Sequence, residues 1–310
     1  MSKEHRPHRP LRSALPILVA AVLGLTGCGK NTAPGADGAA PAAGKKQLIT
    51  NIGSDTMVNL ATVWAEAYAA VEPDVSVEVT GGGSGQGIAA LINGACDLAN
   101  CSRSFEEKEI ADLKAKRQLE PREFLVGLDA LCVLVHKNNP LEEISIEELG
   151  EMYRADGKVT KWSDIGVTIP GAKGDEIIRV SRQNNSGTYQ YFKETVVGKA
   201  NEFKLGSVDM NGSKDVIELI ARTPNAIGYS GMGYITPEVK ALKISRKKGE
   251  PAGAPSIETT LDKTYPISRP LLMYTAGEPA PHVKKYIDWV MSEPGQKIVA
   301  ETGYVHLPKQ

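Results

Sequence analysis

Apolar residues follow two spacings along the chain from residue 47 onward, and segments with the two spacings alternate. In some segments the apolar residues are consecutive or alternate with polar ones, as in β-strands; in others they recur every three or four residues, as on one face of a helix. The first series predicts strands at 48–52, 75–79 and 96–101 and helices at 57–71, 87–93 and 106–117. This order indicates an α/β protein with a largely parallel sheet covered by helices.

A long apolar run at residues 124–137 suggests a division into two lobes. The run is longer than an ordinary strand, which indicates an element that crosses between domains. A second series follows, with helices expected at 146–153, 189–197, 213–221 and 282–292, strands at 177–180 and 226–230, and an extended segment at 265–274. We predict two α/β lobes joined by two crossings, with lobe I at residues 47–130 and 265–310 and lobe II at residues 131–264. Residues 240–263 are too irregular to assign.

Residues 1–27 have the features of a lipoprotein signal peptide. Basic residues precede an apolar stretch at 15–25 that is too short to span a bilayer, and Leu25-Thr26-Gly27-Cys28 is typical of a bacterial lipobox. We expect Cys28 to be lipidated and to anchor the protein to a bacterial membrane, outside the cytoplasm. An ordinary signal peptide with a chance cysteine and an uncleaved anchor are the alternatives. Residues 28–46 are rich in Ala, Gly and Pro and predict a flexible tether.

Charge and residue counts exclude several kinds of site. Residues 1–27 carry a net charge of +3, so the formal −1 of the whole chain becomes about −4 without them, and no Lys/Arg run marks a nucleic-acid binder. The three histidines after residue 27 are scattered, so we expect no histidine-based metal site and no His-driven triad. Cys101 and Cys132 are the candidates for a disulfide, with buried free thiols as the alternative.

Three loops rich in glycine or hydroxyl residues each follow an expected strand and precede an expected helix. They are Gly53-Ser54-Asp55-Thr56, residues 81–87 (Gly-Gly-Gly-Ser-Gly-Gln-Gly) and residues 182–188 (Arg-Gln-Asn-Asn-Ser-Gly-Thr). In open α/β sheets such loops gather at the carboxyl ends of the strands, where ligands bind. Helix N-termini, hydroxyls and glycine backbone favour a small oxyanion, and Arg182 adds a full charge. Each loop taken alone also has a simpler explanation; the loop at residues 53–56, for example, could be a helix N-cap.

Enzymatic use of these loops has little support in the sequence. The glycine-rich loop lacks the dinucleotide, phosphate-loop and nucleophile-elbow motifs. A phosphatase or hydrolase that uses Ser84 or Ser186 is a weak alternative, because no histidine or lysine is near either serine in sequence and no ligand cluster would hold a metal. A purely structural surface lipoprotein is a further alternative, and it predicts no converging anion site.

The same motifs resemble those of the PstS family, the substrate-binding lipoproteins of phosphate ABC transporters. The resemblance extends over residues 47–308 and also rests on residues 97–103 (Asp-Leu-Ala-Asn-Cys-Ser-Arg), Asn139-Pro140, residues 161–164 (Lys-Trp-Ser-Asp) and residues 226–229 (Ala-Ile-Gly-Tyr). It implies the two-lobed type II periplasmic-binding-protein fold, high-affinity binding of inorganic phosphate, delivery to the permease subunits of an ABC transporter, and a monomer without cofactor or catalytic residues. The resemblance implies Thr56, Ser84, Ser102, Arg182, Ser186, Gly187 and Thr188 as phosphate-binding residues, and we add Ser54, Asp55 and Arg103 from the same loops.

One position departs from the family pattern. Well-studied members carry an aspartate directly after the serine that matches Ser102, and it accepts a proton from the ligand; here that position is Arg103. Phosphate near neutral pH carries a proton and sulfate does not, so an acceptor carboxylate rejects sulfate. We expect Asp55 to supply the acceptor, with helix N-capping as its alternative role, and Arg103 to add a second positive charge. Asp129 is expected to be a hinge residue with a backbone partner.

The sequence therefore predicts a non-catalytic phosphate receptor whose lobes close on the anion. A receptor for another tetrahedral oxyanion such as sulfate, or a phosphate sensor without transport, is the alternative within the same class.

Overall fold

The strands and helices of a computed structural model, which describes residues 46–308, follow the alternating order expected from the sequence. The expected signal peptide, the lipidation at Cys28 and the tether up to residue 45 lie outside the described residues.

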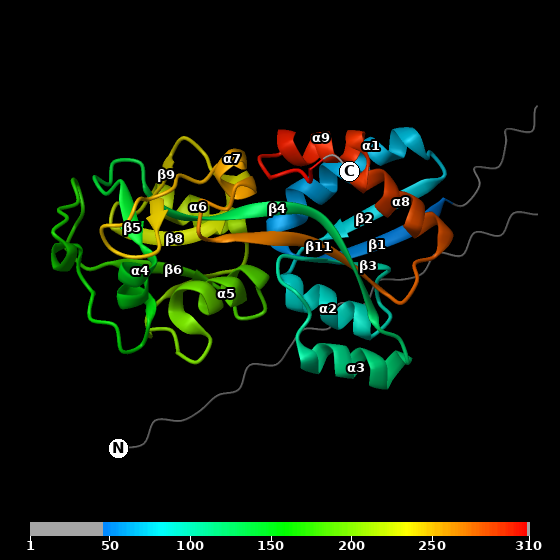
Figure 1. Ribbon diagram of the computed structural model, residues 1–310, viewed down its shortest axis with the longest axis horizontal. Coiled ribbons are helices and arrows are strands. Elements are labelled where there is room, and N and C mark those ends of the chain that lie inside the picture. Colours follow the sequence, from blue (N-terminus) through cyan, green and yellow to red (C-terminus); the bar gives the residue numbers. More distant parts are fainter. Residues whose placement is uncertain (1–45, 309–310) are drawn as a thin grey trace, which may run out of the picture. The chain divides into compact units, whose positions relative to one another are not determined.

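Strands of both lobes join one sheet. Its strands are β1 (Gln47–Gly53), β2 (Val75–Thr80), β3 (Leu98–Cys101), β4 (Pro121–His136), β6 (Ile178–Arg182), β7 (Val208–Met210), β8 (Ala226–Gly231), β9 (Val239–Ala241) and β11 (Ser268–Ala276). Within residues 46–308 these nine strands take the order β2-β1-β3-β11-β4-β8-β6-β7, and β9 pairs with β4 (Figure 1). A separate parallel pair is formed by β5 (Glu143–Ser145) and β10 (Lys243–Ser245).

Pairing direction distinguishes the strands within each lobe from those that cross between lobes. β1 is parallel to β2 and β3, and β6 is parallel to β7 and β8, as strands linked through helices must be. The antiparallel pairings of the described sheet all involve β4 or β11. These two strands run side by side through both lobes (Figure 1). The expected crossing element at residues 124–137 is therefore confirmed as part of β4.

Helices pack on the sheet in both lobes. They are α1 (Val58–Val71), α2 (Ser84–Ile92), α3 (Glu107–Arg117), α4 (Ile146–Tyr153), α5 (Gly187–Phe192), α6 (Ser213–Ala221), α7 (Ile257–Leu261), α8 (Pro281–Met291) and α9 (Glu293–Glu301). Short 3-10 turns are η1 (Asp55–Met57), η2 (Trp162–Ile165) and η4 (Met232–Tyr234), and η3 (Lys193–Gly198) is a π-helical turn.

Some elements differ from the sequence expectation. Helix α2 begins at Ser84 and not at residue 87, because Gly83 takes φ 100° and turns the chain directly into the helix. The single helix expected at 189–197 is α5 followed by the π turn η3. Short elements such as β5, β7, β9 and β10, with three residues each, were not expected, because three residues are too few to show a period.

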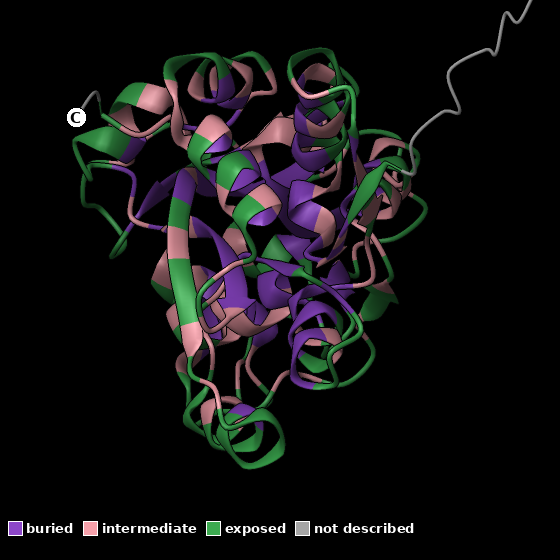
Figure 2. Cartoon of the chain, turned by 90° about the vertical axis from the view of Figure 1, so that its right-hand side faces the viewer, coloured by how far each residue is buried: buried purple, intermediate pink, exposed green. Residues whose placement is uncertain are grey.

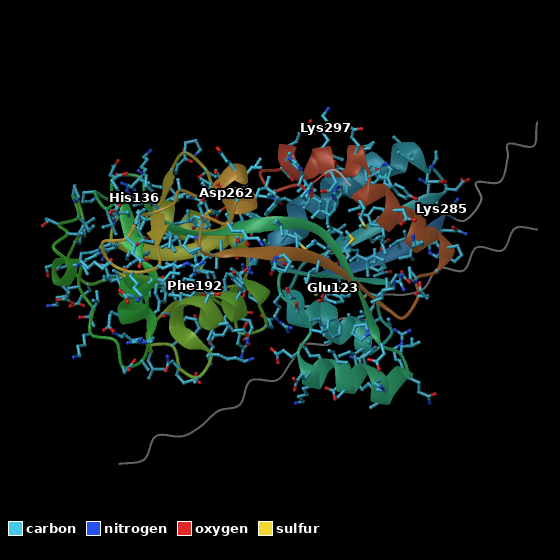
Figure 3. The ribbon with its side chains drawn as sticks, in the orientation of Figure 1. Glu123, His136, Phe192, Asp262, Lys285 and Lys297 are labelled. Carbon is cyan, nitrogen blue, oxygen red and sulfur yellow. The ribbon has the colours of Figure 1, made fainter. Side chains whose placement is uncertain are left out.

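Each lobe has its own hydrophobic core, which Figure 2 shows as the buried interior. In lobe II, Phe192 (Figure 3) stacks on Tyr229 with ring centroids 3.8 Å apart. In lobe I, Trp64 is fully buried and its Nε1 donates to the carbonyl oxygen of Gly295 at 2.8 Å, which attaches α1 to α9. Burying one large side chain of this kind stabilises a fold by about 1.5–3 kcal/mol.

The crossing strands contribute to both cores. In β4, Val126 belongs to the lobe I core and Ala130 to the lobe II core. In β11, Leu271 belongs to the lobe I core, and Ile267, two residues before Arg269 and directly before β11, belongs to the lobe II core. We call residues 126–130 and 267–271 the hinge segment.

The described residues contain three cysteines and no helix suited to cross a membrane. Cys96, Cys101 and Cys132 are buried free thiols, which is the alternative to the Cys101–Cys132 disulfide. No helix within residues 46–308 combines the length and the apolar character that crossing a membrane requires.

Candidate functional site

The carboxyl ends of parallel strands carry the candidate residues. Ser54 follows β1, Ser84 follows β2 and Ser102 follows β3, and because these strands are parallel the three loops meet at one edge of the sheet. In lobe II, Arg182 ends β6, and Ser186 is the N-cap of α5.

Three serine hydroxyls of lobe I form one buried cluster. Ser54 Oγ donates to Ser102 Oγ at 3.0 Å, and Ser84 Oγ lies 3.4 Å from Ser102 Oγ. The backbone N–H of Ser102 donates to Ser84 Oγ at 3.1 Å, which fixes the position of that hydroxyl. All three residues are buried. These groups are small, polar and rotatable, so they suit an oxygen-rich ligand.

Loops of the two lobes contact each other across this cluster. Thr56 Oγ1 and Thr188 Oγ1 are 2.9 Å apart, and both residues are buried. The N–H of Gly85 donates to the carbonyl oxygen of Asn185 at 3.0 Å. The structure therefore shows the lobes closed on one another, with hydroxyls of both lobes at the contact.

Arg182 places a buried positive charge beside these hydroxyls. Its Nη1 donates to Ser213 Oγ at 3.0 Å, and its Nη2 donates to Asp55 Oδ2 at 3.0 Å and to the carbonyl oxygen of Asn211 at 2.9 Å. Burial lowers the pKa of the guanidinium and the Asp55 carboxylate opposes this, but an arginine remains charged. Its Nε is buried without a hydrogen-bond partner, so the site has donor capacity left for an acceptor.

Asp55 links three loops through its carboxylate. Its Oδ1 accepts from the backbone N–H of Gly82 at 3.0 Å and its Oδ2 accepts from Arg182. The N-cap of the following turn is Ser54, so the alternative role of Asp55 as a helix N-cap is wrong. That Asp55 accepts a ligand proton stays a prediction.

Arg103 forms an ion pair that was not expected from the sequence. Its Nη1 and Nη2 donate to the Glu109 carboxylate at 2.8 and 2.7 Å, and Nη1 also donates to the carbonyl oxygen of Ser104 at 2.8 Å. Glu109 lies in the first turn of α3, where its carboxylate also completes a capping box. The expected second positive charge is therefore paired with Glu109, and a contact of Arg103 with the anion stays a prediction.

A second arginine, which was not expected, lies in the hinge segment. Arg269 in β11 pairs with Asp129 in β4, with Nη2 and Oδ2 2.8 Å apart, and also donates from Nη2 to Thr56 Oγ1 at 3.1 Å. Asp129 has the expected backbone partner, the N–H of Met232 at 2.9 Å. One signal for Arg269 was present in the sequence, namely a single charge inside the apolar segment 265–274.

The serines have capping and structural partners. Ser186 Oγ accepts from the N–H groups of Thr188 and Tyr189 at 3.1 and 3.4 Å, as an N-cap does. Ser102 contacts Ser84 and Ser54, and none of these three hydrogen bonds within the described residues involves a general base. Among residues 46–308, no group of three or more His, Cys, Asp or Glu side chains is placed to hold a metal ion.

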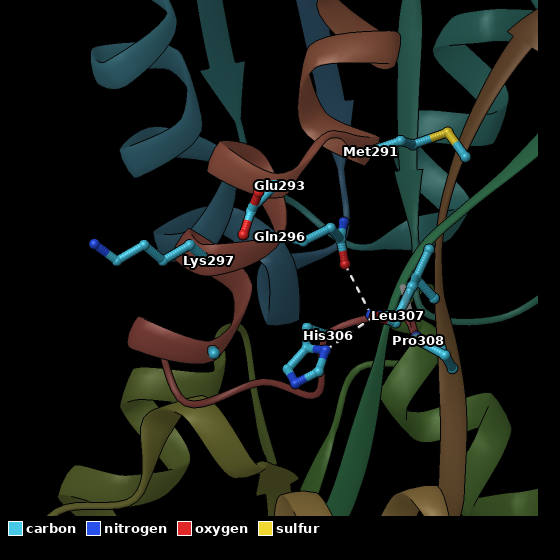
Figure 4. Close-up of a pocket in the computed structure, with 8 residues that line it drawn as sticks. Met291, Glu293, Gln296, Lys297, His306, Leu307 and Pro308 are labelled. Atoms are coloured by element: carbon cyan, nitrogen blue, oxygen red, sulfur yellow. Dashed lines mark hydrogen bonds between the residues drawn. The ribbon is translucent and has the colours of Figure 1, made fainter. Parts of the chain in front are cut away.

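A cavity of about 520 Å³ lies elsewhere, beside α9 and the C-terminal segment (Figure 4). It is lined by Met291, Glu293, Gln296, Lys297, Ala300, His306, Leu307 and Pro308. None of these residues belongs to the loops at 53–56, 81–87 and 182–188 or to the segment after β3, so this cavity is separate from the candidate site.

Comparisons with known proteins agree with this architecture. The model of the PBP superfamily domain matches residues 35–294. The phosphate-binding protein PstS of Pseudomonas aeruginosa is 32% identical over 277 residues, which covers 86% of this chain and 85% of that protein, and PstS of Bacillus subtilis is 31% identical over 292 residues, covering 93% and 90%. A solved structure described as a phosphate ABC transporter substrate-binding protein with bound phosphate, from Clostridium perfringens, has a TM-score of 0.74 and 28% identity, covering 84% of this chain and 100% of that chain. The chain belongs to the PBP superfamily and, within it, to the PstS family of phosphate-binding proteins.

Proposed function

We propose that this chain binds inorganic phosphate between its two lobes and delivers it to the permease of an ABC transporter, as a binding protein and not as an enzyme. The observation that carries the proposal is the meeting of buried hydroxyls from both lobes beside the buried Arg182. The PstS relatives and the phosphate-bound relative support phosphate as the ligand and the transporter as the destination.

The chemistry of the site suits a tetrahedral oxyanion. Arg182 supplies charge and an unpaired Nε donor, and the hydroxyls of Thr56, Ser84 and Thr188 supply neutral donors from both lobes. A ligand drives closure only if it binds the closed form more tightly than the open one. A phosphate that contacts both lobes at once satisfies this condition, because the open form offers it the donors of a single lobe.

Phosphate is distinguished from sulfate, in our proposal, by Asp55. A protonated phosphate oxygen donates to its carboxylate, whereas sulfate has no proton and meets repulsion. Asp55→Asn keeps the size and removes the charge, so we expect phosphate binding to weaken and sulfate binding to strengthen. Asp288→Asn, at an exposed ion pair with Lys284 in α8, is the matched control and should change neither.

The experiment that tests the function is isothermal titration with phosphate, sulfate, arsenate and molybdate, after bound anion has been removed by unfolding and refolding. Heat on phosphate addition without turnover supports the proposal. Absence of phosphate heat defeats it, and preference for sulfate replaces phosphate with the alternative oxyanion. Unchanged phosphate and sulfate affinities in Asp55→Asn would remove Asp55 from the selectivity argument alone.

Anchoring at Cys28 is a separate part of the proposal and rests on the sequence of residues 25–28. A lipid at Cys28 and a flexible tether would hold a monomeric receptor outside the cytoplasm and near its permease. Partition into a detergent phase that is lost in Cys28→Ser supports this, and equal partition of both proteins contradicts it. Light scattering of the purified protein tests the monomer.

A further inference from the structure

The Asp129–Arg269 ion pair is the most deeply buried charge pair with a contact to the candidate site. Both side chains have 0% exposure, and the two residues face each other in the register of β4 and β11. Arg269 donates to Asp129 Oδ2 from Nε at 3.0 Å and from Nη2 at 2.8 Å. Two donors on the one oxygen Oδ2 fix the plane of the guanidinium.

The pair reaches both lobes. Oδ1 of Asp129 accepts from the N–H of Met232 in lobe II, and the Arg269 guanidinium lies 5.8 Å from the ring centre of Tyr191, also in lobe II. On the lobe I side, Arg269 Nη2 donates to Thr56 Oγ1 at 3.1 Å. The hinge segment is thus joined by hydrogen bonds to one hydroxyl of the candidate site.

The contact between Arg269 and Thr56 limits how the Thr56 hydroxyl can hydrogen-bond. An arginine can only donate, so Thr56 Oγ1 must accept from Arg269, and the single proton of that hydroxyl is left for another partner. Thr188 Oγ1 lies 2.9 Å away in the closed structure, and either hydroxyl can be the donor of that hydrogen bond. We propose that Arg269, held by Asp129, is a positioning residue that fixes Thr56 as a hydrogen-bond donor toward the bound anion.

In this proposal, a residue of the hinge segment determines whether the Thr56 hydroxyl donates to the anion. Without Arg269, the Thr56 hydroxyl is free to rotate and to accept as well as donate, so its interaction with an anion is no longer pre-organised. Nε of Arg269 donates to Asp129 and Nη2 to both Asp129 and Thr56, while the buried Nη1 has no hydrogen-bond partner among the described residues. This inference rests on the proposed phosphate binding.

A double-mutant cycle measured by phosphate titration tests the proposal. Replacing the pair together, as Asp129→Leu with Arg269→Met, avoids leaving one buried charge unpaired. We expect this change to weaken phosphate binding by about tenfold or more when Thr56 is present and by less than about twofold in the Thr56→Val background. Arg179→Met is the control, since Arg179 is also largely buried and charged but donates to Leu205 and not to Thr56.

Urea unfolding of each variant shows whether it is folded. If the paired replacement does not fold, Arg269→Lys takes its place under the same criteria, because one ammonium cannot reproduce the planar fork to Asp129 and Thr56. Equal losses with and without the Thr56 hydroxyl, no loss at all, or an equal loss in Arg179→Met would each overturn the inference. Wild-type protein that binds no phosphate would instead defeat the proposed function itself.

Discussion

Replacing Gly187 with alanine tests whether the closed contact between the lobes is the binding state. Gly187 is the first residue of α5 in lobe II and faces the serine cluster of lobe I. A Cβ at this position would lie 2.3 Å from Ser84 Oγ, 2.7 Å from Ser102 Oγ and 3.0 Å from Ser84 Cβ. Ordinary contacts begin near 3.4 Å, so the loops must separate or Ser84 must abandon its position.

The size of the effect follows from the cost of overpacking. An extra methyl group in a packed contact costs about 1–3 kcal/mol. Because the contact exists in the closed form, this cost falls on closure, and we expect phosphate binding to weaken about 5- to 150-fold. The free energy of unfolding of each lobe should not decrease, since alanine is favoured over glycine in a helix by about 0.5–1 kcal/mol.

Titration calorimetry and a thermal melt without ligand measure the two effects. Gly150→Ala in α4 is the matched control, because its Cβ would meet the Val196 carbonyl oxygen at an acceptable 3.4 Å. We expect Gly187→Ala to melt at or above the wild-type temperature and to bind phosphate weakly. Wild-type affinity in Gly187→Ala would refute the reasoning, because the closed contact would then not be needed for binding.

A backbone clash, a charge and a buried thiol give three more predictions. Gly295→Ala should lower the free energy of unfolding, measured in urea, by about 2 kcal/mol or more, because the new Cβ would lie 2.3 Å from the Val290 carbonyl oxygen. The phosphate affinity should not change. Wild-type stability would contradict this prediction. Arg182→Lys should weaken phosphate binding about tenfold or more in calorimetry, because one ammonium cannot replace the planar fork; an unchanged affinity would contradict this. Burial raises the pKa of the Cys96 thiol to about 12, so Ellman's reagent should label this thiol near neutral pH only after unfolding. The free energy of unfolding should also fall as the pH rises from about 9 to about 12, because the unfolded thiol ionises first. Rapid labelling of the folded protein would contradict this prediction.

Much of the fold was predictable because its elements are periodic. The apolar run of β4 and the helical spacing of α1 carry their own signal, and the loops that precede helices were placed correctly around Thr56, Ser84 and Ser186. The separate helix α9 was not predicted, because it starts immediately after α8, with Ser292 as the boundary of both helices.

The candidate site was predictable where a residue acts within its own loop and not where it depends on a distant partner. Arg103 follows Ser102 in sequence, but its direction is set by Glu109 six residues later, which no loop pattern reveals. Arg269 acts on Thr56 across 213 residues, and only the pairing of β4 with β11 brings it there. Long-range ion pairs of this kind require the tertiary structure.

The central claim is that one phosphate is held by donors from both lobes, and comparing Ser84→Ala with Thr188→Ala in phosphate titrations tests it most directly. Ser84 lies in lobe I and Thr188 in lobe II, and both are buried at the contact between the lobes. The account predicts one phosphate per chain in wild type and a loss of about tenfold or more in each variant. If only one of the two variants lost phosphate affinity and the other kept the wild-type affinity, the two-lobed phosphate site would be contradicted.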